Sequence, residues 1–197
     1  MKTTVSIWNL AAIAVLLSLP AEAREFEVTV TVGGVCALPA GVLETALNTT
    51  TELFAPLGVK LSFTPAEREQ PGADAIWLHL MRRAPREAGL LVLGAAIMAT
   101  QPPAAVVFCD RVLAFAQPHN SHDTGVVLGY AIAHELGHIL RNEPGHCGNG
   151  VMKAAWGSAD IVRMLQHALA FSKQDRAYIQ AGLAAREQTR RMTARAR

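Results

Sequence analysis

HELGHILRNEPGHCGNGVM, residues 134–152, constrains the fold and the chemistry of this chain more than any other stretch. Residues four apart on a helix lie one turn apart on the same face, so His134 and His138 can point toward one metal ion. Glu135 is offset from His134 by about 100° and can lie beside the metal without binding it. A carboxylate next to zinc-activated water is a hydrolytic arrangement, so the stretch predicts a catalytic zinc site.

A third ligand is expected, because catalytic zinc usually has three protein ligands and one open position. His146 is the candidate. Asn142 can adopt the left-handed conformation that ends helices, and Pro144 and Gly145 allow the chain to reverse toward the metal. The nearby alternatives for this position are Cys147, Glu143 and Asp160. Cys147 is the strongest of them, because its sulfur suits zinc.

Two further residues in this region have a structural interpretation. Gly137 offers little bulk, so another element can approach the helix closely there. Met152 follows the candidate ligand loop, and it is interpreted either as a hydrophobic floor under the metal or as ordinary core packing.

These residues resemble the motif of the metzincin zinc peptidases, H-E-x-x-H-x-x-G-x-x-H followed by a Met-turn. The resemblance implies zinc bound by His134, His138 and His146, Glu135 as general base, and Met152 as the Met-turn methionine. More closely, HELGHIL followed by GHCGNGVMKAAW is similar to small secreted bacterial proteins with a metzincin-type site. It implies zinc-dependent hydrolysis of peptide bonds in a peptide or protein substrate.

The chain departs from that motif at two places. Arg141 occupies the position of the family's glycine, and Pro144 occupies that of its third histidine, so His146 comes two residues late. Some metzincins also place a tyrosine just after the Met-turn. Here Trp156 is nearby and the next tyrosine is Tyr178, so no such tyrosine is expected to take part.

The rest of the chain predicts an α+β domain. Alternating or apolar runs predict strands over 25–32, 59–65, 75–83 and 104–110, and the apolar, glycine-broken run 89–100 is either an edge strand or a buried one. Helices are expected over 40–54, from a cap at Asp123 or Thr124 to 140, over 159–170, and from a Ser172 cap to 185. The metzincin resemblance implies a twisted, mostly parallel sheet with an active-site helix and C-terminal helices.

The two ends of the chain are expected to lie outside this domain. Residues 1–23 contain Lys2, an apolar run, Pro20 and the sequence Ala-Glu-Ala, which is the pattern of a secretory signal peptide. Cleavage after Ala23 leaves a domain over 24–185 that is secreted or periplasmic. The apolar run is short for a bilayer, so no stable membrane span is expected after cleavage. Residues 186–197 hold five arginines and predict a basic, flexible tail.

Composition limits the remaining possibilities. The chain is 51% hydrophobic with a formal net charge of +2, which favours a compact globule and gives no reason to expect nucleic acid. Cys36, Cys109 and Cys147 could pair in any of three ways or remain free thiols. The small size leaves a second function open, a zinc-stabilised binding or scaffold domain with little turnover.

Overall fold

The computed structural model describes residues 25–66, 74–116 and 121–195, so the expected signal peptide lies outside the described residues. The elements in chain order are β1 (Phe26–Val35), α1 (Val42–Phe54), the short 3₁₀ helix η1 (Ala55–Leu57), β2 (Val59–Pro65), β3 (Ile76–Met81), β4 (Gly94–Ile97), β5 (Ala104–Phe108), α2 (Cys109–Ala116), α3 (Ser121–Arg141), α4 (Ser158–Leu165) and α5 (Lys173–Arg195).

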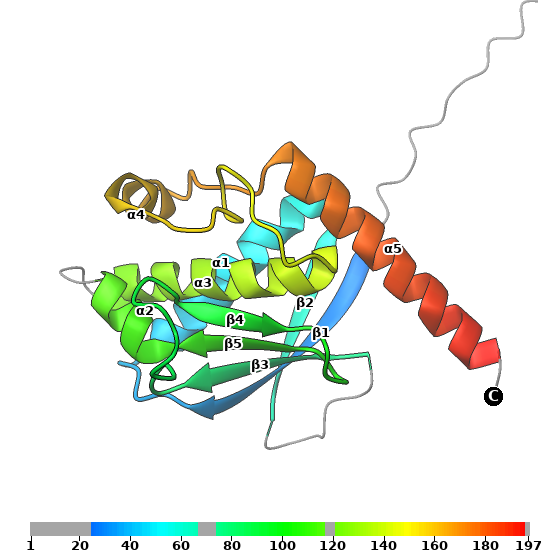
Figure 1. Ribbon diagram of the computed structural model, residues 1–197, viewed down its shortest axis with the longest axis horizontal. Helices are drawn as coiled ribbons and strands as arrows, with labels where there is room; N and C mark the ends of the chain where they lie inside the picture. The colour runs from blue at the N-terminus through cyan, green and yellow to red at the C-terminus, as the bar shows by residue number, and fades with distance from the viewer. Residues whose placement is uncertain (1–24, 67–73, 117–120, 196–197) are drawn as a thin grey trace, which may run out of the picture.

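The strands form a five-stranded sheet in the order β2-β1-β3-β5-β4 (Figure 1). Strands β2, β1, β3 and β5 run parallel to one another, and β4 alone runs antiparallel, beside β5 at one edge. The expected mostly parallel sheet is therefore confirmed. So is the edge interpretation of the run 89–100, since β4 comes from it.

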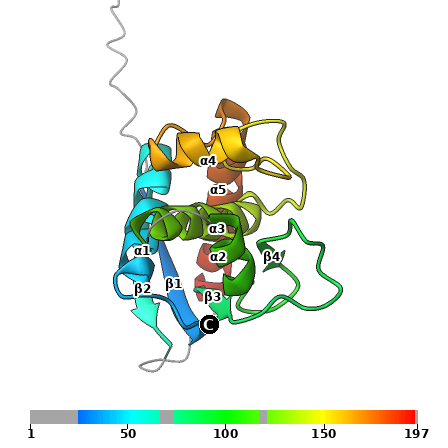
Figure 2. The same ribbon diagram turned by 90° about the vertical axis from the view of Figure 1, so that its left-hand side faces the viewer.

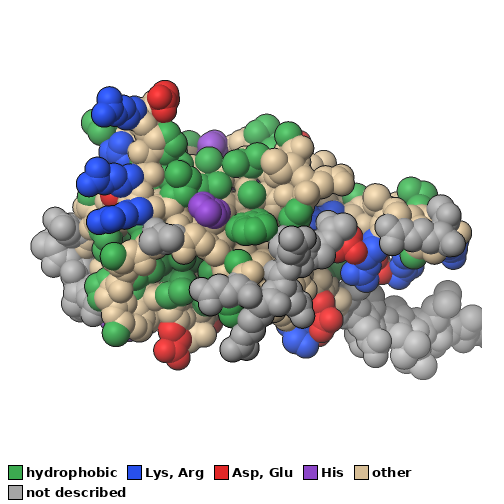
Figure 3. All heavy atoms as spheres, turned by 90° about the horizontal axis from the view of Figure 1, so that it is seen from below, with side chains coloured by type: hydrophobic (Ala, Val, Ile, Leu, Met, Phe, Trp, Pro, Cys, Tyr) green, Lys and Arg blue, Asp and Glu red, His purple; other side chains and the backbone are tan. Residues whose placement is uncertain are grey.

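Helices α1 and α3 pack together over one face of this sheet, and the sheet curves around α3 (Figure 2). Gly125 and Gly129 of α3 permit the close approach. A Cβ on Gly125 would lie 2.6 Å from Cβ of Thr45, and one on Gly129 would lie 2.7 Å from the carbonyl oxygen of Ala46. Thr50 of α1 also donates a hydrogen bond of 3.1 Å to the carbonyl of Gly129. Burial alternates along β3, where Ile76, Leu78 and Leu80 are buried. Seen from below Figure 1, the molecule shows hydrophobic side chains across its middle and basic ones toward both ends (Figure 3).

The helices differ from the sequence predictions mainly at their ends. Asp123 and Thr124, the expected caps of α3, lie inside its first turn, because the helix already includes Ser121. Helix α2 was not predicted, and α4 ends at Leu165, before the expected limit. In the part of the chain that is described, no helix is both long and apolar enough to cross a bilayer.

The C-terminal helix also extends further than expected. Helix α5 continues to Arg195, so residues 186–195 are helical, whereas the sequence predicted a flexible tail there. One reason is that Arg186 does not lie free in solvent: its Nη2 donates a hydrogen bond of 3.2 Å to the carbonyl of Asp74. Burial accordingly lowers the pKa of the Arg186 guanidinium.

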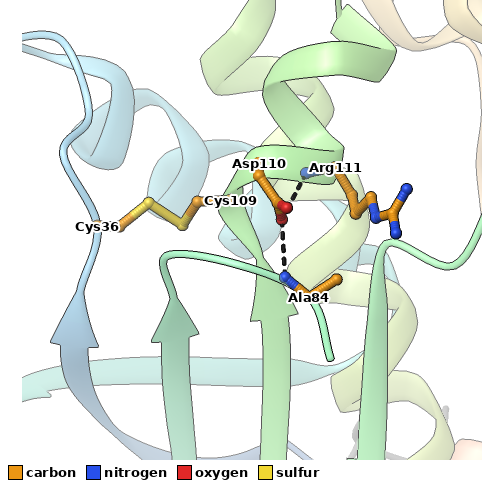
Figure 4. The surroundings of a disulfide bond; sticks show 5 residues. All are labelled: Cys36, Ala84, Cys109, Asp110 and Arg111. Atoms are coloured by element: carbon orange, nitrogen blue, oxygen red, sulfur yellow. Dashed lines mark hydrogen bonds between the residues drawn. A yellow bond between two sulfur atoms is a disulfide. The ribbon is translucent and has the colours of Figure 1, made fainter. Parts of the chain in front are cut away.

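A disulfide joins Cys36 to Cys109 and leaves Cys147 as a free thiol (Figure 4). The bond connects the segment after β1 to the first residue of α2. Asp110 reinforces the same region, because its Oδ1 accepts hydrogen bonds from the backbone N–H groups of Ala84 and Arg111 at 3.0 and 2.9 Å. The carboxyl ends of β1, β3 and β5 are thereby linked to α2.

Candidate metal centre

Helix α3 places His134 and His138 one turn apart, as their spacing predicts. Nδ1 of His134 lies 2.8 Å from the carbonyl oxygen of Val151, and Nδ1 of His138 lies 3.0 Å from that of Glu143. A carbonyl only accepts, so each Nδ1 carries the proton and each Nε2 presents a lone pair. The two Nε2 atoms face one another at 3.1 Å. Metal-binding histidines are oriented in this way by a carbonyl on the opposite ring nitrogen.

His146 joins this pair from the loop that follows α3. The helix ends at Arg141, and Asn142 takes the predicted left-handed conformation with φ of 53°. The His146 ring centroid lies 5.2 Å from that of His134 and 4.8 Å from that of His138. Potential ligand atoms of the three histidines all lie within 4.8 Å of one another. Among the described residues, this group of side chains could hold a metal ion.

The three alternative ligands have other partners or other positions. The Cys147 thiol donates a hydrogen bond of 2.9 Å to Oδ1 of Asp175. The Asp160 carboxylate lies 2.6 Å from Nζ of Lys153. Glu143 is exposed and contributes its backbone carbonyl to His138. The geometry therefore brings His146 to the pair and leaves the alternatives outside the group.

The protonation of the histidines suits a metal ion. Burial lowers the pKa of His134 to about 4, although the Val151 carbonyl opposes the shift, and burial also lowers the pKa of His138. Both imidazoles are neutral at pH 7, which is the form that binds metals. Three histidines, one of them exposed, match the ligand composition of a catalytic zinc site, which keeps an open position. The residues present fit zinc.

Glu135 lies beside this group, and 6% of its surface is exposed. Burial raises the pKa of its carboxyl group to about 8. A nearby cation favours the charged form, so a metal ion at the histidines would lower this pKa again. Gly94 of β4 makes room for the side chain: a Cβ at that position would lie 2.8 Å from Oε1 of Glu135.

Met152 is fully buried directly against Gly137 of α3. A Cβ at Gly137 would lie only 2.4 Å from Sδ of Met152, so the glycine is what admits the methionine. The structure thus realises the close approach expected at Gly137. It also places Met152 next to Val151, whose carbonyl orients His134.

A cleft of about 270 Å³ opens beside the histidines and Glu135. One wall is the edge strand and the segment before it, with Leu91, Val92, Leu93, Gly94, Ala95 and Ala96. The opposite wall is the segment that follows Met152, residues 153–156. Trp156 ends that segment, and its ring stands edge-on to His134 with centroids 5.3 Å apart. The cleft is therefore a largely apolar channel between an open strand edge and a loop.

The loop wall is held by a second carboxylate. Asp160 Oδ2 lies 2.6 Å from Lys153 Nζ and accepts a hydrogen bond of 2.9 Å from the backbone N–H of Gly157. Burial alone would raise the pKa of Asp160, but these contacts outweigh burial and the net pKa lies below its ordinary value. Asp160 thus supports the cleft as an ionised carboxylate that fixes its loop wall.

A buried polar cluster behind the ligand loop was not predicted from the sequence. Asp175 of α5 is fully buried, and its Oδ1 lies 3.3 Å from Nη1 of Arg141. The Arg141 guanidinium also lies over the Tyr178 ring, 5.2 Å from its centroid. Tyr178 therefore packs on this side of the loop and does not line the cleft, as the sequence led us to expect. Arg141, which replaces the glycine of the family motif, contacts Asp175 and Tyr178, and the sequence did not predict these contacts.

No family model matches the chain. No curated protein matches it either. Among solved structures, the chain is similar to the crystal structure of archaemetzincin from Methanopyrus kandleri, with a TM-score of 0.53 and 20% sequence identity. The match covers 84% of this chain and 99% of that one. This chain has a metzincin-like fold. The metzincin-like fold class expected from residues 134–152 is confirmed, since the match extends over most of the domain.

Proposed function

We propose that this metzincin-like domain is a zinc-dependent peptidase. The observation that carries the proposal is the convergence of three histidines beside a buried glutamate at the side of an open cleft. His134, His138 and His146 would hold the zinc ion, and Met152 would be the methionine of a Met-turn beneath it. The likeness to archaemetzincin supports the fold on which this assignment rests.

Zinc, when bound, supplies Lewis-acid activation of water and of the scissile carbonyl group. Glu135 is placed to act as general base, because it follows His134 directly and its buried side chain borders the cleft. It would take a proton from the attacking water and pass it to the nitrogen of the leaving amine. Its burial excludes bulk water, which strengthens the electrostatic effect of the carboxylate on the reacting groups.

The edge strand gives a physical reason for a peptide substrate. β4 pairs with β5 on one side, and its other side borders the cleft. An extended peptide can add to such an edge by backbone hydrogen bonds. The apolar side chains Leu91, Met98 and Phe115 line the same cleft and favour an apolar residue near the scissile bond.

We also propose that the protein is exported to the periplasm or secreted. The signal-like pattern of residues 1–23 supports this, and the Cys36–Cys109 disulfide agrees with an oxidising compartment. The chain would then be one of the small secreted bacterial proteins whose site it resembles. Fractionation of cells that produce the full chain, with determination of the N-terminal residue of the exported form, tests this part.

The function is tested by incubating the purified protein with a mixed peptide library and measuring zinc content. We expect one zinc per chain and cleavage of peptides. Glu135→Gln should retain zinc and lose about 10²- to 10⁴-fold in kcat/KM, the usual contribution of a general base. His134→Ala should lose both zinc and activity.

Two results would contradict the proposal in different ways. A wild-type chain that binds no zinc removes the metal site itself. A wild-type chain that binds zinc but cleaves no peptide, and behaves like Glu135→Gln, favours the alternative of a zinc-stabilised binding or scaffold domain.

A further inference from the structure

We infer that Asp175 of α5 is a positioning residue for the third metal ligand, acting through Arg141 and Cys147 on the two sides of His146. The inference rests on the proposed zinc site, but its structural basis is independent of catalysis. It explains how a chain that lacks the motif's glycine and carries its third histidine late can still present that histidine to the metal.

Gly145 and Cys147, the neighbours of His146 in the sequence, are both linked to the Asp175 carboxylate, Gly145 through Arg141 and Cys147 directly. On the N-terminal side, Nη1 of Arg141 donates a hydrogen bond of 3.2 Å to the carbonyl of Gly145 and lies 3.3 Å from Oδ1 of Asp175. On the C-terminal side, the Cys147 thiol donates to that same Oδ1 at 2.9 Å. His146 is thus the residue between two fixed points.

The carboxylate is itself held firmly. Oδ2 of Asp175 accepts hydrogen bonds from the backbone N–H and the hydroxyl of Ser172, at 3.0 and 2.6 Å. Asp175 is fully buried and the Arg141 side chain is 3% exposed, so their interaction is little weakened by solvent. Removal of either charge would leave the other buried without its partner.

The anchoring matters because His146 is exposed. His134 and His138 are fixed by the helix and by two carbonyl groups, whereas His146 stands on a loop rich in glycine. An ordered loop lowers the entropy lost when the third imidazole binds the metal. Groups that orient metal ligands typically contribute 10- to 100-fold to metal affinity.

The test measures zinc affinity of the full chain by competition with a chelator, well below the unfolding temperature. We expect Asp175→Asn to weaken zinc binding about 10- to 100-fold and Cys147→Val to weaken it about 10-fold. Cys147→Ser keeps a donor for Asp175 and should bind zinc within about twofold of wild type. The Co²⁺-loaded Asp175→Asn protein should have a visible spectrum shifted toward that of His146→Ala.

The matched control is Arg186→Met, on the same helix but far from the ligand loop in sequence and in contact with Asp74. It removes a partly buried charge and should lower stability without changing zinc affinity. Equal zinc affinity in wild type, Asp175→Asn and Cys147→Val would overturn the inference, as would an equal loss in Arg186→Met. If Asp175→Asn does not fold, the comparison of Cys147→Val with Cys147→Ser decides.

Hydrogen exchange of the metal-free protein separates this inference from the proposed function. The backbone N–H of Cys147 donates a hydrogen bond of 2.8 Å to the carbonyl of Met152 and should be protected. We expect its exchange to accelerate in Asp175→Asn and Cys147→Val but not in Arg186→Met. If the wild-type chain binds no zinc, the proposed function fails, while this exchange pattern still supports or refutes the anchoring role of Asp175.

Discussion

The carbonyl oxygen of Val151 lies 2.8 Å from Nδ1 of His134, so the residue before Met152 sets the tautomer of a candidate-site histidine on another element. Because the carbonyl only accepts, Nδ1 is protonated and Nε2 faces the other histidines. The segment around Met152 therefore has two contacts with α3. Its backbone orients His134, and its methionine side chain occupies the space above Gly137.

Gly137→Ala is expected to disturb both contacts. The new methyl group would lie about 2.4 Å from Met152 Sδ, which is buried and has little room to move. We expect a loss of about 1–3 kcal/mol in the free energy of unfolding, typical of overpacking. Zinc affinity should fall as well, because a displaced Met152 shifts the Val151 carbonyl. Chemical denaturation and chelator competition measure the two effects.

Gly148→Ala is the matched control for that change, since a Cβ at Gly148 meets nothing within 4 Å. It should leave both quantities near their wild-type values. A Gly137→Ala protein with unchanged stability and zinc affinity would contradict the close packing described for Met152.

Gly94→Ala is expected to separate catalysis from metal binding. The added methyl group would lie 2.5 Å from the backbone carbonyl oxygen of Val106 and 2.8 Å from Oε1 of Glu135, so β4 and the carboxylate must both shift. A small misplacement of a catalytic group can cost about 100-fold in rate. We therefore expect kcat/KM to fall by about that factor while zinc content stays at the wild-type level. Gly157→Ala, with no atom within 4 Å of its Cβ, serves as the control.

Lys153 and Asp160 give a pH-dependent contribution to stability. The folded pKa of Asp160 lies below its ordinary value, so the contact stabilises the protein above the unfolded pKa of about 4. That contribution is lost as the pH falls through the folded pKa, when the carboxylate is protonated in both states. We expect Asp160→Asn to cost about 1 kcal/mol at pH 7 and progressively less below pH 4. Urea denaturation of both proteins across this range measures the difference, and a constant difference at all pH values would refute it.

The Cys36–Cys109 disulfide should contribute stability without affecting the metal site. It closes a loop with a sequence separation of 73, for which chain-entropy reasoning gives about 4 kcal/mol. We expect a Cys36→Ala, Cys109→Ala protein to lose roughly that free energy of unfolding but to keep wild-type zinc affinity. Cys147→Ser, which removes the free thiol, should not change the response to reducing agents.

Local patterns were sufficient to predict most of the strands and the geometry of His134 and His138, whereas the parallel pairing of the strands was implied by the metzincin resemblance. The apolar runs that form β2, β3 and β5 end near their predicted limits, because Gly, Pro and charged residues flank them. The two histidines needed only the helical repeat, which fixes their relative direction once α3 forms. The position of Gly137 between them likewise indicated a close approach, although it did not identify Met152 as the partner.

Other features depend on contacts between distant parts of the chain. The extension of α5 beyond residue 185 goes with the contact between Arg186 and Asp74, and few apolar residues mark its course. The pairing of Cys36 with Cys109 was one of three open choices. His146 could not be separated from Cys147 as a ligand, because Asp175, which engages the Cys147 thiol, lies on another element.

The edge strand that borders the cleft has a cost for the protein wherever its concentration is high. An unpaired strand edge is a template for pairing with another copy of the same chain, and it promotes aggregation when it is long and apolar. β4 spans only Gly94–Ile97, and three of its four side chains are glycine or alanine. Such a short strand offers a neighbouring molecule few backbone groups for pairing, although the segment just before it exposes Leu90 and Leu91. The unpaired backbone groups of β4 remain available to a peptide in the cleft, which the opposite wall of the cleft would also contact.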